Sequence, residues 1–191
     1  MPVLLRAAAL VSMVGLLAGD LEAQEALGDC LWPGPAAFLL DRPSPPDSVI
    51  VAIANGGVKV CFSRPSARGR TVFGDLVPYG RLWRTGANEP TVLHLSREVE
   101  VAGVRLGPGR YVVLTIPQVD SWTIIFSTSD APVPAQMFED RTEVARASAA
   151  VEHLDTHVEA FQVRGIGGRD EGALILEWER TRVLIPIRRP S

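Results

Sequence analysis

Residues 48–63 read SVIVAIANGGVKVCFS, and the periodicity of this stretch predicts its backbone. The run 49–53 consists largely of β-branched residues, and the sequence Asn55-Gly56-Gly57 that follows accepts the positive φ of a tight turn. In residues 58–63, apolar side chains alternate with a lysine, a cysteine and a serine. We therefore predict a β-hairpin whose second strand has one buried face and one wetter face.

Short apolar or alternating runs recur along the rest of the chain, and glycine- or proline-containing turns separate them. They occupy residues 91–95, 99–101, 110–117, 122–127, 158–163, 173–178 and 182–187. Residues 137–151 are ambiguous, because the alanines favour helix while the alternation of residues 144–149 suits an edge strand. Nine to eleven short strands at this spacing predict an all-β fold, a single antiparallel β-sandwich or jelly-roll-like domain over residues 48–189.

Two segments precede this domain. Residues 1–23 read as a signal peptide, with Arg6, an apolar run over residues 7–18 and small residues up to Ala23. The alternative is a retained anchor helix, but the apolar run is shorter than the ~20 residues of a membrane span. We expect export to the periplasm or the extracellular space, and no membrane span in the mature chain. Residues 24–47 form a leader whose proline density argues against a helix or a central strand.

The chain has two cysteines, Cys30 in the leader and Cys61 in the domain. An exported protein reaches a compartment that permits disulfides, so a Cys30–Cys61 bond is one interpretation. The alternative is that Cys30 lies in an unstructured leader and Cys61 packs as a small strand residue. A nucleophilic cysteine is the least favoured interpretation, because no histidine lies near either cysteine in the sequence.

Composition and motifs argue against several classes of function. The formal net charge of −3 disfavours nucleic acid as the main partner, because binding a phosphate backbone requires a basic surface. The sequence has no Gly-x-Ser-x-Gly elbow, and the glycine-rich segment 165–168 precedes no predicted helix, so it is not a phosphate-binding loop. We therefore expect no nucleic acid partner and no cofactor.

Groups that can bind or react concentrate between Phe62 and Thr91. Arginine guanidinium groups match planar oxyanions in a two-point geometry, and Tyr79 and Trp83 can supply an apolar floor. The candidate ligand-binding residues are Arg64, Arg68, Arg70, Tyr79, Trp83, Arg84, Asn88 and Glu89. The alternative is that these arginines pair internally with Asp75, Glu89 and other acids and so order a long loop.

Three function hypotheses follow from this stretch. The first is a binding module for a small polar or anionic ligand. The second is a hydrolase-like enzyme in which Glu89 is the general base and the arginines stabilise an oxyanion, which requires a raised pKa at Glu89. The third is a structural envelope protein that acts through its edge strands. Whether the protein is an enzyme stays open at this point.

The histidines carry a weaker signal. On a strand, His153, Asp155 and His157 share one face, which is a plausible edge for a divalent metal. The zinc-binding pattern His-Glu-x-x-His is absent because Leu154 follows His153, so we favour a solvated face and expect no metal site. His94 alternates with leucines and is expected on the surface of a strand.

Several of these strings resemble the domain of unknown function 2911 (DUF2911), a family of exported bacterial proteins. They are RPSP at 42–45, CFSRPSARGR at 61–70, LVPYG at 76–80, LWRTGANE at 82–89 and LEWERTRV at 176–183. The resemblance spans residues 42–187. It implies a β-rich secreted or periplasmic domain with no activity to carry over, and it favours a strand in the ambiguous segment around Ala145 to Val151.

Overall fold

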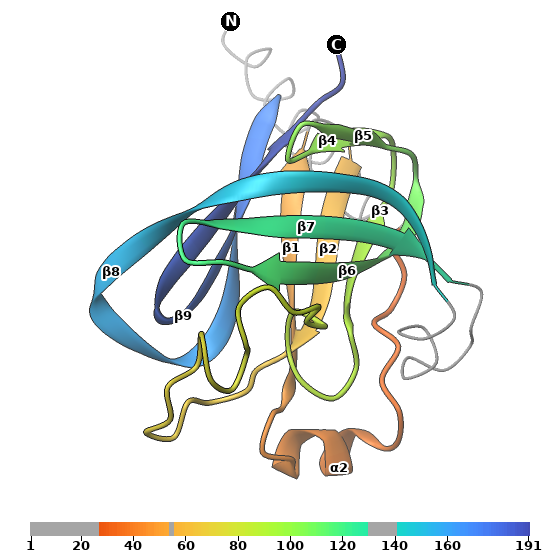
Figure 1. Ribbon diagram of the computed structural model, residues 1–191. Helices are drawn as coiled ribbons and strands as arrows, with labels where there is room; N and C mark the ends of the chain where they lie inside the picture. The colour runs from red at the N-terminus through yellow and green to blue at the C-terminus, as the bar shows by residue number, and fades with distance from the viewer. Residues whose placement is uncertain (1–26, 54–55, 130–140) are drawn as a thin grey trace, which may run out of the picture.

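A computed structural model describes residues 27–53, 56–129 and 141–191, and the regular secondary structure in this part of the chain is almost entirely β (Figure 1). It contains one short helix, α2 (Ala36–Asp41), and nine strands. The strands are β1 (Pro46–Ile53), β2 (Gly56–Ser63), β3 (Thr91–Leu95), β4 (Val99–Val101), β5 (Val104–Leu106), β6 (Gly109–Pro117), β7 (Ser121–Thr128), β8 (Thr142–Ile166) and β9 (Glu171–Arg188).

All nine strands belong to one antiparallel sheet of order β1-β2-β3-β6-β7-β8-β9-β4-β5, which confirms the all-β prediction. The two layers of the sandwich come from this one sheet, and it does not close into a barrel. The 25-residue strand β8 makes the fold possible: its first part pairs with β7, and its later part pairs with β9. Figure 1 shows β8 crossing beside β6 and β7, bending, and returning beside β9 in the other layer.

The core lies between the two layers and is apolar. Inward-facing side chains from both layers are almost fully buried, among them Val51, Val60, Leu93, Phe126, Leu176 and Ile185. Burial of apolar area at about 25 cal/mol per Å² is the main term that favours the folded state. The alternation noted in residues 58–63 is what places Val58, Val60 and Phe62 in this core.

The turn between β8 and β9 covers the C-terminal end of the free edge of β1, at Ala52 and Ile53. Gly168 N–H donates a hydrogen bond to the Ala52 carbonyl oxygen at 3.2 Å. A Cβ at Gly167 would lie only 2.8 Å from that same oxygen, and a Cβ at Gly165 would lie 2.6 Å from Val51 Cγ2. The glycine-rich segment thus packs closely against strand β1. Bulkier residues in this segment would push it away from β1.

Some local predictions need correction. Gly56 and Gly57 belong to β2 rather than to the turn, because Gly56 pairs with Ile53. The ambiguous segment is a strand from Thr142 onward, as the resemblance implied. Asn55, and the part of the ambiguous segment before residue 141, lie outside the described residues.

The leader contains a helix, although its proline density argues against one. Helix α2 spans only the six proline-free residues between Pro35 and Arg42, and Pro35 stands at its N-cap, where a missing N–H costs nothing. Pro46 begins β1, an edge strand, which is a position that tolerates proline. The prolines therefore set the ends of these elements rather than preventing them.

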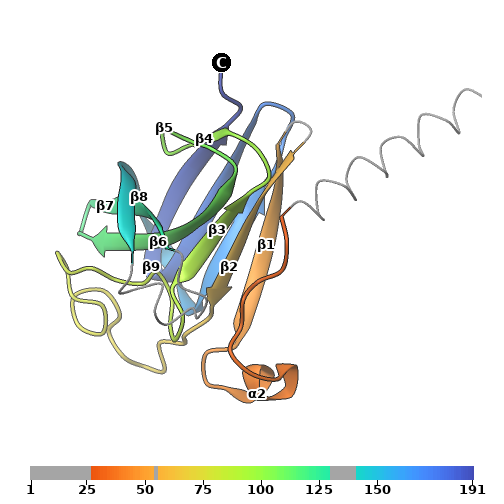
Figure 2. The ribbon, with the colours of Figure 1, turned by 90° about the vertical axis from the view of Figure 1, so that its right-hand side faces the viewer.

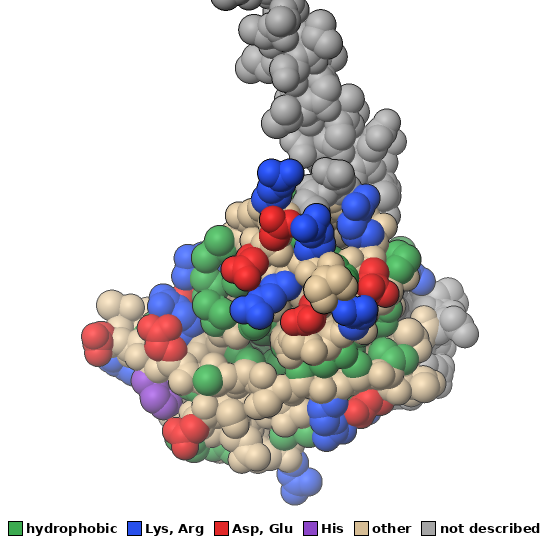
Figure 3. Space-filling model, turned by 90° about the horizontal axis from the view of Figure 1, so that it is seen from above, with side chains coloured by type: hydrophobic (Ala, Val, Ile, Leu, Met, Phe, Trp, Pro, Cys, Tyr) green, Lys and Arg blue, Asp and Glu red, His purple; other side chains and the backbone are tan. Residues whose placement is uncertain are grey.

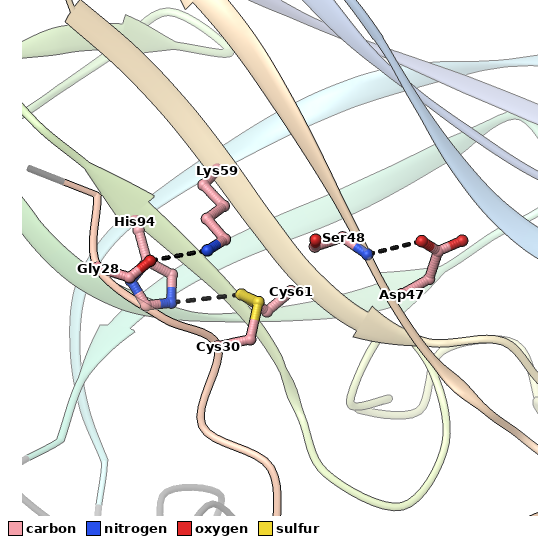
Figure 4. Close-up of a disulfide and its surroundings, with 7 residues drawn as sticks. All are labelled: Gly28, Cys30, Asp47, Ser48, Lys59, Cys61 and His94. Atoms are coloured by element: carbon pink, nitrogen blue, oxygen red, sulfur yellow. Dashed lines mark hydrogen bonds between the residues drawn. A yellow bond between two sulfur atoms is a disulfide. The ribbon is translucent and has the colours of Figure 1, made fainter. Parts of the chain in front are cut away.

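The leader runs along β2 in the same direction and covers the face predicted to be wetter (Figure 2). Leu27 lies over Gly57, and the Gly28 carbonyl oxygen accepts a hydrogen bond from Lys59 Nζ at 2.7 Å. Cys30 forms a disulfide with Cys61, whose Cα lies 5.7 Å away (Figure 4). The leader thus meets every second residue of β2, because side chains of one strand face alternate in sequence.

His94 lies under this leader. The sequence predicted a surface strand residue, and that prediction is wrong because the leader covers the imidazole. Its side chain is 4% exposed, it pairs across the sheet with Lys59, and its Nε2 lies 3.5 Å from the Cys61 sulfur (Figure 4). Burial lowers the pKa of His94 to about 4, with the positive charges of Lys59 and Arg110 acting in the same direction. The residue is therefore a neutral, buried imidazole at ordinary pH.

The surface at the end that carries β4 and β5 mixes both signs of charge (Figure 3). Arg188 Nε lies 3.6 Å from a Glu171 carboxylate oxygen, and Arg189 Nε lies 3.0 Å from one of Asp170.

The described part of the chain contains no helix that is long and apolar enough to cross a bilayer.

Candidate functional site

The long connection between β2 and β3 covers one end of the sandwich and bounds an open cleft. It is tied to the sheet by backbone hydrogen bonds: Ala67 N–H donates to the Glu159 carbonyl, Phe161 N–H donates to the Pro65 carbonyl, and Trp83 pairs with Thr115 of β6. The cleft has a volume of about 320 Å³. This lies at the lower end of the range for small-molecule sites.

The floor of the cleft is aromatic. Trp83 and Trp178 both line it, and their rings stack with centroids 6.0 Å apart and an interplanar angle of 24°. Phe73, Trp122 and Phe161 surround Trp83 with edge-on contacts, and Trp83 Nε1 donates to the Gly86 carbonyl oxygen at 2.9 Å. These contacts leave Trp83 little freedom, so the floor is rigid.

One wall of the cleft comes from residues 65–77 and carries Arg70. Its guanidinium is oriented by two backbone acceptors: Nε donates to the Ala67 carbonyl at 2.8 Å and Nη2 donates to the Ser66 carbonyl at 2.9 Å. No described carboxylate lies within ion-pair distance of this guanidinium. The positive charge of Arg70 therefore lies at the cleft, and no described acidic side chain neutralises it.

The opposite wall comes from residues 84–88 and from Ser44 of the segment between α2 and β1. Arg84 Nη1 donates to the Asn88 carbonyl, and the Asn88 amide donates to the Ser44 carbonyl at 3.2 Å. Arg84, Asn88 and Ser44 all line the cleft. Ser44 of the leader thus completes a site whose other lining residues begin at Pro65, and it contacts Asn88, which lies 44 positions further on.

The backbone of this wall is strained at Thr85. Its φ is +56°, which is unusual for a β-branched residue and costs on the order of 1–3 kcal/mol. Two buried hydrogen bonds hold it there: Thr85 Oγ1 donates to Thr115 Oγ1 at 3.1 Å, and Thr91 Oγ1 donates to the Thr85 carbonyl at 2.6 Å. The hydrogen bonds around Thr85 thus hold a strained backbone conformation next to the cleft.

Glu89 does not face the cleft. Arg42 of the leader binds it at two points, with Nη1–Oε1 and Nη2–Oε2 distances of 2.8 Å, and Ser63 Oγ donates to it at 3.2 Å. Burial raises the pKa of Glu89, but the hydrogen bonds and charge of Arg42 outweigh burial, and the net shift is below the ordinary value of 4.5. This direction is opposite to the one that a general base requires.

The structure brings together four of the eight predicted residues, namely Arg70, Trp83, Arg84 and Asn88. The other four lie outside the cleft lining. Besides Glu89, Arg64 lies 3.4 Å from Asp47, Arg68 contacts Glu159 through its backbone N–H at 2.8 Å, and Tyr79 packs over Gly74 at the surface.

Sequence reasoning missed Arg42 and Ser44. Both belong to the string RPSP at 42–45, which contributes to the family resemblance. A buried carboxylate at the end of the site loop needs a cationic partner, and Arg42 was the arginine closest to the domain on its N-terminal side. The signal was therefore present, but nothing in the sequence spacing distinguished this arginine from those at 64–84.

The histidine face on β8 forms no metal site in the part of the chain that the structure describes. No group of three or more His, Cys, Asp or Glu side chains is placed there to hold a metal ion. His153 is exposed, and His157 Nε2 lies 3.2 Å from a carboxylate oxygen of Glu159.

The family model of DUF2911, described as a protein of unknown function, matches residues 44–187. The chain belongs to the DUF2911 family. The match includes the β2–β3 connection with Arg70, Trp83, Arg84 and Asn88, and it begins at Ser44 of the cleft wall. Searches of curated proteins and of solved structures returned no match.

Proposed function

We propose that this DUF2911 protein is a binding module for a small anionic or polar ligand, held in the cleft between residues 65–77 and 84–88. The observation that carries the proposal is Arg70. A guanidinium that is oriented by two carbonyls and has no described carboxylate beside it is prepared for an oxyanion. A rigid aromatic floor and a second guanidinium, Arg84, support the same assignment.

The hydrolase-like alternative has weaker support. Its proposed base, Glu89, is bound by Arg42 and Ser63 and has a lowered pKa, so it is a poor proton acceptor. The structural alternative needs an available sheet edge. The β8–β9 turn covers the end of the β1 edge at Ala52 and Ile53, and the opposite edge strand, β5, has only three residues.

A thermal-shift screen of the purified protein against organic acids, phosphates and acidic and neutral glycans tests the proposal. We expect at least one acid to raise the Tm of the wild type, and the rise to be lost in Arg70→Ala and in Arg84→Ala. Arg81→Ala is the matched control, because Arg81 is an exposed arginine of the same loop that does not line the cleft. The proposal is wrong if no ligand raises the Tm, or if Arg70→Ala and Arg81→Ala respond like the wild type.

We also propose that the protein is exported to the periplasm or the extracellular space. The features that support export are the apolar run near the N-terminus and the Cys30–Cys61 disulfide, since disulfides persist in oxidising compartments. Fractionation of cells that express the full chain, followed by mass determination of the processed N-terminus, tests this. Recovery of an uncleaved chain in the cytoplasm would contradict it.

A further inference from the structure

We propose that the ligand is an amphiphilic acid, that is, an organic acid that carries an aliphatic chain or an aromatic ring. This inference rests on the proposed function and names the ligand class of the same cleft. The acid group would lie at Arg70 and Arg84, and the apolar group would lie on the side of the cleft that Leu76 and Val77 form.

The charged and apolar parts of the cleft belong to one compact turn. Leu76 N–H donates to the Thr71 carbonyl at 3.3 Å, and Val77 N–H donates to the Val72 carbonyl at 2.8 Å. These hydrogen bonds fold residues 71–77 back on themselves, directly after Arg70. Arg70, Leu76 and Val77 therefore line the same cleft from the same turn.

Leu76 is a lining residue whose side chain is 41% exposed, so part of the cleft wall is apolar surface in contact with water. A ligand that consisted only of an acid group would leave this surface wet. A ligand with an apolar substituent would remove it from water, which stabilises the complex in proportion to the area covered.

Other exposed apolar side chains lie in the same loop as Leu76 and in the turn that this loop contacts. Tyr79 and Leu82 follow in the same loop, and Gly80 N–H donates to the Pro117 carbonyl at 2.9 Å, which sets this loop against the β6–β7 turn and Val119. We call Leu76, Tyr79, Leu82 and Val119 the apolar rim. Exposed apolar side chains close to a charged cleft support a ligand that has an apolar part.

The test is a homologous series of straight-chain carboxylic acids, from acetate to octanoate, titrated by calorimetry into the purified protein. We expect the affinity to rise with chain length, by up to about fourfold for each methylene that becomes buried. Leu76→Asn should reduce this gain while acetate binding persists. Leu184→Asn is the matched control, because Leu184 is also an exposed leucine but does not line the cleft. Arg70→Ala should weaken every acid, by about tenfold.

The outcomes separate the inference from the proposed function. If short and long acids, inorganic phosphate and sugar acids bind equally well and lose affinity in Arg70→Ala, the proposed function stands and the amphiphilic ligand is wrong. If hexanol binds as well as hexanoate and Arg70→Ala changes neither, the cleft is an apolar site and the anion-binding function is wrong. If no acid binds the wild type, both are wrong.

Discussion

Arg42 and Glu89 lie 47 residues apart, and their side chains form a two-point ion pair that is nearly buried, with 10% and 7% of the two side chains exposed. The pair joins the leader to the end of the cleft loop. Arg42 Nε also donates to the Ser44 carbonyl at 3.0 Å, and this carbonyl accepts the Asn88 amide. The ion pair thus holds a wall of the cleft, although neither of its members lines it.

Removal of Arg42 tests the structural role of this pair. Arg42→Ala should lower the free energy of unfolding by about 3–5 kcal/mol, because it leaves the Glu89 carboxylate buried without its cation. Urea denaturation measures the change. Arg64→Ala is the matched control, since the Arg64–Asp47 pair is largely exposed and should contribute no more than about 1 kcal/mol. Equal effects of the two substitutions would contradict the assignment.

His94 predicts an acid sensitivity that begins near neutral pH. Its pKa is about 4 in the folded protein and about 6.5 in the unfolded chain, so between these values only the unfolded chain binds the proton. The free energy of unfolding should therefore fall as the pH drops from 6.5 to 4, by at most about 1.4 kcal/mol per pH unit. The pKa values of Glu89 and Glu177 are lowered from 4.5, so these carboxyl groups lose their stabilisation as the pH falls below about 4.5, and they overlap only the lower end of this window.

Stability measured against pH in His94→Gln should show a shallower fall over this window. His153→Gln changes an exposed histidine of β8 and should follow the wild-type profile. If all three profiles coincide between pH 6.5 and 4, His94 is not the group responsible.

The disulfide should contribute measurably to stability. It closes a loop with a sequence separation of 31, for which the loss of unfolded-state entropy corresponds to about 2–4 kcal/mol. Thermal unfolding with and without reductant should show a lower Tm in the reduced protein. The double substitution Cys30→Ser with Cys61→Ser should have that lower Tm in both buffers. A reductant effect that persists in the double variant would come from another source.

Gly167 tests the contact between β1 and the opposite layer. Gly167→Ala should destabilise the protein by about 1–3 kcal/mol, because its Cβ would meet the Ala52 backbone oxygen at 2.8 Å. Gly107→Ala is the control, as the nearest atom to its Cβ would be Tyr111 Oη at 4.0 Å. Comparable Tm values for the two variants would show that β1 can move away from residue 167 without loss of stability.

Strand character was predictable wherever residues alternate on a half-buried sheet, as in residues 58–63, because that period is local. The continuity of β8 was not predictable. Its middle, around His153 to His157, is exposed on both sides of the strand, so apolar residues do not alternate there. The burial of His94 also had no local signal. The leader, more than 60 positions earlier in the chain, covers it. The spacing of residues in a sequence does not reveal a contact between segments that far apart.

The site was predictable as a region but not as a set of residues. A cluster of arginines indicates that guanidinium groups are concentrated, yet it does not say which of them meet an acid. Arg64 forms an ion pair with Asp47 of β1, whereas Arg70 donates hydrogen bonds to carbonyl oxygens of its own loop. That difference depends on the path of the chain after Pro65, which the sequence does not specify.

The bond between Cys30 and Cys61 also determines how the protein responds to mechanical force. Tension applied to the N-terminal end of the chain would pass through the sulfur atoms directly into β2, and the loop that contains α2 and β1 would carry none of it. Reduction would release this stored length of 31 residues, up to about 110 Å when fully extended. A single-molecule extension trace would therefore distinguish the two redox states by the length of the unfolded chain.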